Sequence, residues 1–73
     1  MQERFVGKRG ADLIAIRDRL GVTQRAVAAA MDTTATTLYR WERDMVKVTP
    51  LMYARYEAAA HQVFEAKLAG DAA

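Results

Sequence analysis

The stretch from Thr23 to Arg43 constrains the fold more than any other part of this chain, because it is typical of two short helices joined by a tight turn. Thr23 and Thr34 each precede a helical pattern, at the position where a hydroxyl accepts a hydrogen bond from a free amide of the first turn. At about 100° per residue, the second helix turns Leu38 and Trp41 to one side. The opposite arc holds small, hydroxyl-bearing and basic residues: Ala35, Thr36, Tyr39, Arg40 and Arg43. Such a helix packs with one side and is free to bind a ligand with the other.

A set of positions in this stretch follows one pattern without a gap: Thr23, Gln24, Val27, Ala28, Met31, Thr34, Leu38, Trp41 and Glu42. A Thr-Gln pair opens one helix, an apolar residue and Ala follow, and a Thr cap precedes a helix that ends in Trp-Glu. With these residues the segment resembles the helix-turn-helix of the phage repressor and Cro-type (Xre-like) DNA-binding family. The small side chain of Ala28 suits two helices that cross closely.

The chain departs from that pattern at its turns. The family usually has Gly between the two helices, where the backbone tends to be left-handed, and this chain has Asp32. Asp tolerates a left-handed backbone less well than Gly, so we expect some local strain. Thr33 stands where an apolar residue usually packs into the core, and Asp44 stands where Gly often ends the third helix.

The resemblance implies that the helix beginning near Thr34 enters the major groove of double-stranded DNA. The residues expected to face base edges are Thr34, Ala35, Thr36, Tyr39 and Arg40. Arg40 is the strongest candidate for specificity because a guanidinium can bind guanine O6 and N7 together, although it could instead meet only phosphate or solvent. The residues expected at phosphates are Thr23, Gln24, Thr37, Arg43 and Lys47. Tyr39 could equally lie against the sugar-phosphate backbone.

The first helix is expected over residues 11–20, ending at Gly21, with Val22 entering the core. Arg17 interrupts its apolar stripe. In the family that the chain resembles, an arginine here reaches a glutamate of the third helix, matched by Glu42. Paired hydrogen bonds between the two would hold the third helix against the first. The alternative is two unrelated surface charges.

We expect an all-α fold of four to five helices, in the manner of a Cro or repressor domain, with a long C-terminal helix. The chain divides into a basic arm over residues 1–10, one domain over residues 11–70 and a tail over residues 71–73. The helix-turn-helix unit covers residues 23–43 within that domain, and the last helix covers residues 50–68. The arm is either a frayed terminus or a segment that contacts DNA.

The composition excludes several classes of function. The chain has 73 residues, no cysteine and a single histidine, so neither a disulfide framework nor a zinc site is expected. Without serine or cysteine, nucleophilic catalysis lacks its usual groups, and we expect neither an enzyme nor a cofactor. No apolar run approaches the length of a membrane span, and we expect a cytoplasmic protein. The net charge of +2 decides little by itself.

The sequence thus predicts a sequence-specific transcription regulator, a repressor that binds an inverted-repeat operator as a homodimer. Val63, Phe64 and Leu68 of the last helix extend past what so small a body could cover, and they are the expected dimer contacts. Alternatively, Phe64 folds back onto the first helix of its own chain. Two other functions stay open, the antitoxin of a toxin–antitoxin pair and a helical protein-interaction module that no longer binds DNA.

Overall fold

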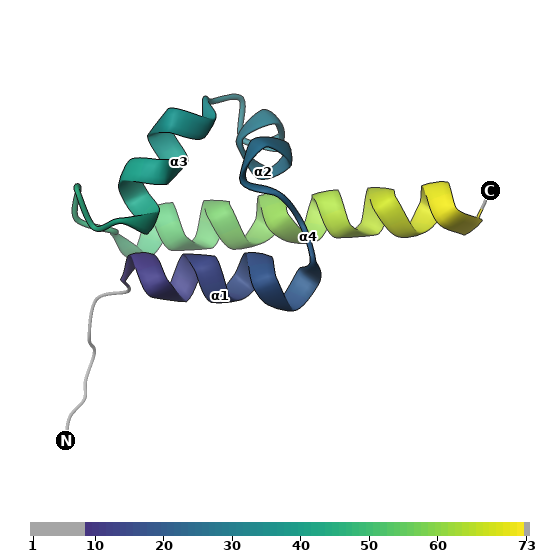
Figure 1. Ribbon diagram of the computed structural model, residues 1–73, viewed down its shortest axis with the longest axis horizontal. Coiled ribbons are helices and arrows are strands. Elements are labelled where there is room, and N and C mark those ends of the chain that lie inside the picture. The colour runs from purple at the N-terminus through teal and green to yellow at the C-terminus, as the bar shows by residue number, and fades with distance from the viewer. Residues whose placement is uncertain (1–8, 73) are drawn as a thin grey trace, which may run out of the picture.

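The protein is described by a computed structural model that covers residues 9–72, and this part of the chain forms four helices (Figure 1). They are α1 (Gly10–Leu20), α2 (Gln24–Ala30), α3 (Ala35–Glu42) and α4 (Pro50–Ala72). Helices α1 and α4 lie side by side and run in the same direction, and α2 and α3 lie above them in the view of Figure 1. The all-α prediction is confirmed. Most of the expected N-terminal arm, residues 1–8, lies outside the described residues, as does Ala73 at the end of the tail.

Threonine caps fix where α2 and α3 begin. Thr23 Oγ1 accepts a hydrogen bond from the amide of Ala26 at 3.1 Å, and Thr34 Oγ1 accepts one from the amide of Thr37 at 3.2 Å. Each cap satisfies an amide that has no partner inside its helix. Because two helices of seven and eight residues are too short to be stable alone, their caps and their packing must hold them.

Left-handed backbone occurs where the sequence predicted it. Asp32 and Asp44 both have φ of 57°, and Gly21 has φ of 67°. The carboxylate of Asp44 accepts a hydrogen bond from the backbone amide of Gly10 at 2.8 Å. Asp44 therefore makes a contact that the glycine usual in the family could not make.

The N-terminal end of α1 packs closely on the C-terminal end of α3. Gly10 is buried, and a Cβ built on it would lie 2.2 Å from the carbonyl oxygen of Glu42. The sequence analysis assigned Gly10 to the arm, but it is the first residue of α1 and a contact point of the body. Arg9 precedes it, and its amide donates to the carboxylate of Asp12 at 2.8 Å.

The core lies where α4 packs against α1 and α2. Its buried apolar residues come from every helix and from the connections before α2 and after α3: Leu13, Ile16, Val22, Val27, Ala28, Leu38, Val48, Tyr56, Ala59 and Ala60. Val22 is buried as predicted. Val48, which belongs to the connector after α3, was not predicted to be part of the core.

Helix α4 is longer than the sequence indicated, since it continues to Ala72 rather than ending at Leu68. Its last turns extend past the other helices (Figure 1). A glycine lowers helix stability by about 1 kcal/mol relative to alanine but removes no backbone hydrogen bond, so Gly70 does not stop the helix. Even at this length, neither α4 nor any other helix in residues 9–72 is apolar enough to cross a membrane.

The expected dimer contacts differ in how much of them is exposed. Val63 and Phe64 are half-buried and pack against the core of their own chain, whereas Leu68 is 51% exposed. The body covers Val63 and Phe64 in part, because both pack against its core. Their role in a dimer stays a prediction.

Candidate nucleic-acid interface

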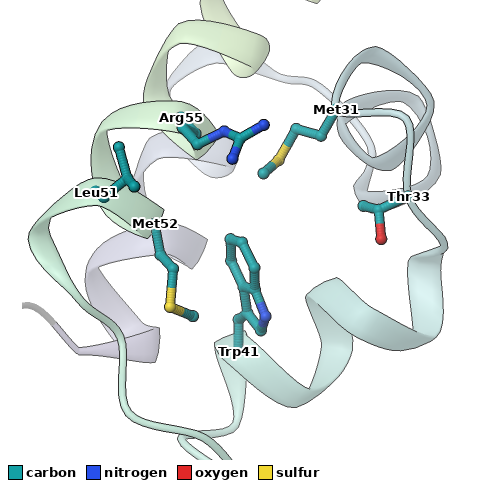
Figure 2. A pocket seen from close by; sticks show the side chains of 6 residues that line it. All are labelled: Met31, Thr33, Trp41, Leu51, Met52 and Arg55. Carbon is teal, nitrogen blue, oxygen red and sulfur yellow. The ribbon is translucent and has the colours of Figure 1, made fainter.

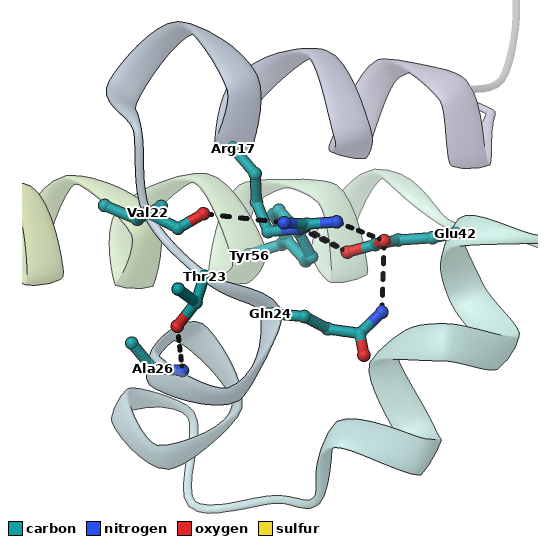
Figure 3. Close-up of polar contacts among 7 residues, drawn as sticks. All are labelled: Arg17, Val22, Thr23, Gln24, Ala26, Glu42 and Tyr56. Atoms are coloured by element: carbon teal, nitrogen blue, oxygen red, sulfur yellow. Dashed lines mark hydrogen bonds and ion pairs between the residues drawn. The ribbon is translucent and has the colours of Figure 1, made fainter.

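A single buried carboxylate joins all four helices. Glu42, at the end of α3, is 6% exposed. Arg17 of α1 donates to it twice, from Nε to Oε2 at 2.9 Å and from Nη2 to Oε1 at 2.9 Å. Gln24 of α2 donates from Nε2 to Oε1 at 3.2 Å, and the hydroxyl of Tyr56 in α4 donates to Oε2. We call these four residues the Glu42 network (Figure 3).

The surroundings of Glu42 keep its carboxylate ionised and the hydroxyl of Tyr56 protonated. Burial by itself would raise the pKa of Glu42, but the hydrogen bonds from Arg17 and Tyr56 and the charge of Arg17 outweigh it and hold that pKa below its ordinary value. Burial and the neighbouring carboxylate raise the pKa of Tyr56, so its hydroxyl stays protonated and can donate. A buried ionised carboxylate with donors on both oxygens is stable, whereas one deprived of Arg17 would be costly.

The Glu42 network fixes the position of α3. Arg17 and Glu42 form the ion pair that the resemblance implied, with side chains 20% and 4% exposed. Tyr56 was not among the site residues predicted from the sequence. The signal available was its hydroxyl, since a tyrosine in the middle of a buried stripe requires a hydrogen-bond partner.

Gln24 makes a contact within the chain that the sequence did not predict. It was predicted to bind phosphate, and its amide nitrogen also donates to Glu42. An ionised carboxylate only accepts hydrogen bonds, so the NH₂ group must face Glu42, and this leaves one N–H bond for another acceptor. Gln24 therefore connects the first turn of α2 to the last turn of α3.

The outer side of α3 is exposed. Four of the expected DNA contacts share it at helical spacing: Thr36, Tyr39, Arg40 and Arg43. The guanidinium of Arg43 lies over the ring of Tyr39, 5.2 Å from its centre, an arrangement that orients both side chains. Glu42 is the only acidic residue of α3, and it is buried on the opposite side.

The remaining expected contacts lie around this side. Ala35 and Thr37 are half-buried, and the hydroxyls of Thr34 and Thr37 are 3.1 Å apart. The cap therefore occupies part of the hydrogen-bonding capacity of both threonines. Thr23 and Lys47 are exposed, at the start of α2 and in the connector after α3.

These features define a class of protein. Two capped short helices, the second held by a buried carboxylate with a basic outer side, make a helix-turn-helix DNA-binding domain. A family model described as helix-turn-helix matches residues 13–60, which is more than half of the 73-residue chain. The chain belongs to the Cro/repressor (Xre-like) helix-turn-helix family and is a DNA-binding transcription regulator of that type. Searches of curated proteins and of solved structures found no match.

Proposed function

We propose that this protein is a sequence-specific repressor that acts in the cytoplasm as a homodimer on an inverted-repeat operator. The observation that carries the proposal is the exposed side of α3, where Thr36, Tyr39 and Arg40 stand beside Arg43. The Glu42 network supports it because a reading helix must hold its side chains in one geometry against the base edges.

Within this proposal, Arg40 reads guanine with two hydrogen bonds from its guanidinium. Thr36 and Ala35 contact thymine methyl groups or donate one hydrogen bond, and Thr34 and Tyr39 border the base edges. The residues at phosphates are Thr23, Gln24, Thr37, Arg43 and Lys47, and the free amides at the start of α2 add to their attraction.

A homodimer is proposed because one module of this size makes few contacts with DNA. Operator-level affinity normally needs two reading helices about one DNA turn apart. The exposed Leu68 is available for contact with a second copy, while Val63 and Phe64 have less surface left to contribute.

A mobility-shift assay on DNA upstream of the protein's own gene tests the proposal. We expect a discrete shifted band that survives a large excess of nonspecific competitor DNA, and a minimal operator with inverted symmetry. If the same concentration of nonspecific competitor removes the shift from the upstream DNA and from unrelated DNA, sequence-specific repression is contradicted.

The exposed side of α3 also bears on the alternatives. A helical module that no longer binds DNA has no need of a basic outer side, and this side carries Arg40 and Arg43. An antitoxin would bind the same DNA and a toxin protein as well. Co-purification with the product of the neighbouring gene, together with growth arrest when that product is expressed alone, would favour the antitoxin.

A further inference from the structure

Helix α4 carries an exposed stripe that the DNA-binding unit does not use. Its members follow one another at alternating spacings of four and three residues: Leu51, Arg55, Ala58, Gln62, Glu65 and Ala69. All are exposed, and Leu51 is 66% exposed. These residues form one face of the helix, and the face combines an exposed leucine with small residues that would let a second helix approach closely. We call these residues the α4 stripe.

We infer that the α4 stripe is the dimer interface and that it packs antiparallel against the same stripe of a second copy. The inference rests on the proposed homodimer and names its contact surface. In a two-fold interface, each residue must meet a partner that belongs to the same surface. An antiparallel pairing centred on Ala60 meets this requirement: Leu51 faces Ala69 of the second copy, Arg55 faces Glu65 and Ala58 faces Gln62. The charged pair is complementary and occurs twice.

The surface beside the α4 stripe can receive a helix. A depression of about 210 Å³ lies there, lined by Met31, Thr33, Trp41, Leu51, Met52 and Arg55 (Figure 2). Figure 2 shows the Arg55 guanidinium directed between Met31 and Trp41, where a carboxylate from a second copy could reach it. A second depression continues along α4 beside Ala58 and Gln62.

Two sequence features that DNA binding leaves unexplained fit this interface. Thr33 stands where the family places a larger apolar residue, and it lines the open depression. The end of α4 carries small residues at Ala66 and Ala69. Small side chains let two helices approach closely, so the end of one α4 can lie over the depression beside the start of the other.

The same pairing is compatible with DNA binding. Met31 at the end of α2 and Trp41 of α3 border the α4 stripe on one side. The two-fold axis of an antiparallel pair stands perpendicular to the layer of the two α4 helices. Both α2–α3 units therefore lie on the same side of that layer, as two reading helices on one DNA duplex must.

Reversal of the charged pair tests the inference. Sedimentation should show the unmodified protein as a dimer at tens of micromolar, and Arg55→Glu or Glu65→Arg should each raise the dimer dissociation constant about tenfold or more, since each reversal creates two like-charge contacts. Mixing the two variants should restore dimers, because every charged contact in the mixed dimer is again between opposite charges. The double variant should also dimerise. Arg19→Glu on α1 makes the same charge change away from the α4 stripe and should leave the dimer intact.

A cross-link tests the direction and register independently of the charges. The chain has no cysteine, so Leu51→Cys and Ala69→Cys each introduce a single thiol. Under mild oxidation, a mixture of the two variants should form a disulfide-linked heterodimer. Leu51→Cys alone should not cross-link, because the two copies of position 51 would lie about 27 Å apart along the helices.

The outcomes separate the interface from the proposed function. If both charge variants remain dimers as tight as the unmodified protein, or if the cysteine mixture gives no heterodimer, the α4 stripe is not the interface. Loss of the dimer in Leu68→Asp would then place the contact on the other edge of α4. If the unmodified protein is a monomer at tens of micromolar, the interface and the homodimer both fail. Sequence-specific DNA binding is judged separately, by the mobility shift. Circular dichroism checks that each variant is folded.

Discussion

At the scale of single residues, the structure depends most on Glu42. A carboxylate that is 6% exposed is stabilised only if both oxygens are well bonded, and here donors from α1, α2 and α4 meet it. The pairing does not make Glu42 a large net source of stability, because desolvation offsets much of the attraction. It does make unfavourable any placement of helix α3 that moves Glu42 away from Arg17 and Tyr56. Orientation of α3 is therefore the main consequence of the Glu42 network.

Truncation of either member of the ion pair should leave the other charge without its partner. We predict that Arg17→Ala and Glu42→Ala each lower the free energy of unfolding by about 2–4 kcal/mol, and that the double variant loses less than the sum of the two. Urea denaturation of the four proteins measures the coupling. Strictly additive losses would show that the two residues do not stabilise each other.

The lowered pKa of Glu42 predicts an acid-dependent stability. Well above its ordinary value of 4.5, Glu42 is ionised in the folded and unfolded chains, and its contribution is fully present. As the pH falls below that value, the unfolded chain takes up the proton first, so the contribution decreases and is lost once the pH passes the lower folded pKa. The difference in unfolding free energy between the unmodified protein and Glu42→Gln should therefore shrink from pH 7 to pH 3. A difference that stays constant over this range would mean that the pKa of Glu42 is not lowered by folding.

At the scale of helices, the contact between α1 and α3 depends on a missing side chain. Gly10 has no Cβ, and the backbone of Glu42 occupies the space that a Cβ would need. Because the obstacle is backbone rather than a flexible side chain, the two helices would have to move apart to admit a methyl group. The Glu42 network and the bond from Gly10 to Asp44 would both be disturbed.

We therefore predict that Gly10→Ala destabilises the fold by about 2–3 kcal/mol, at the upper end of the usual cost of overpacking. Gly70→Ala is the matched control. It lies in open space on α4 and should be neutral or stabilising by up to about 1 kcal/mol, since alanine favours helix. Thermal unfolding of both variants measures the contrast. Equal effects would contradict the close approach of α1 and α3.

The helices differ in how well the sequence predicted them. Where a helix start depends on a local signal, prediction succeeded: the caps at Thr23 and Thr34 lie next to the amides that they satisfy. Features that depend on residues distant in sequence were missed, except for the Arg17–Glu42 pair, which the family resemblance implied. Gly10 is read as a flexible residue unless the position of Glu42 is known, and Tyr56 is read as apolar unless a buried acceptor is known. The end of α4 failed for another reason, because Gly70 weakens a helix without interrupting its hydrogen bonds.

At the scale of the whole molecule, a small chain divides three tasks between its core and two surfaces. The core between α1, α2 and α4 holds the fold, the outer side of α3 is the surface proposed for DNA, and the α4 stripe is the surface inferred for a second copy. The family and the fold followed from the sequence because they depend on patterns within Thr23–Arg43. The surface for a second copy did not, because which residues of α4 remain exposed is decided only when α1 and α2 pack on it.

The central claim is that the outer side of α3 reads DNA sequence, and the most direct measurement of it is the ratio of affinities for operator and random DNA. We predict that Arg40→Ala reduces this discrimination by about 1–3 kcal/mol, the usual cost of a lost bidentate base contact. Lys47→Ala is the control, since an exposed lysine at phosphate should weaken binding to both DNAs alike and reduce its salt dependence. Equal losses on operator and random DNA for Arg40→Ala would contradict its assignment as a base-reading residue.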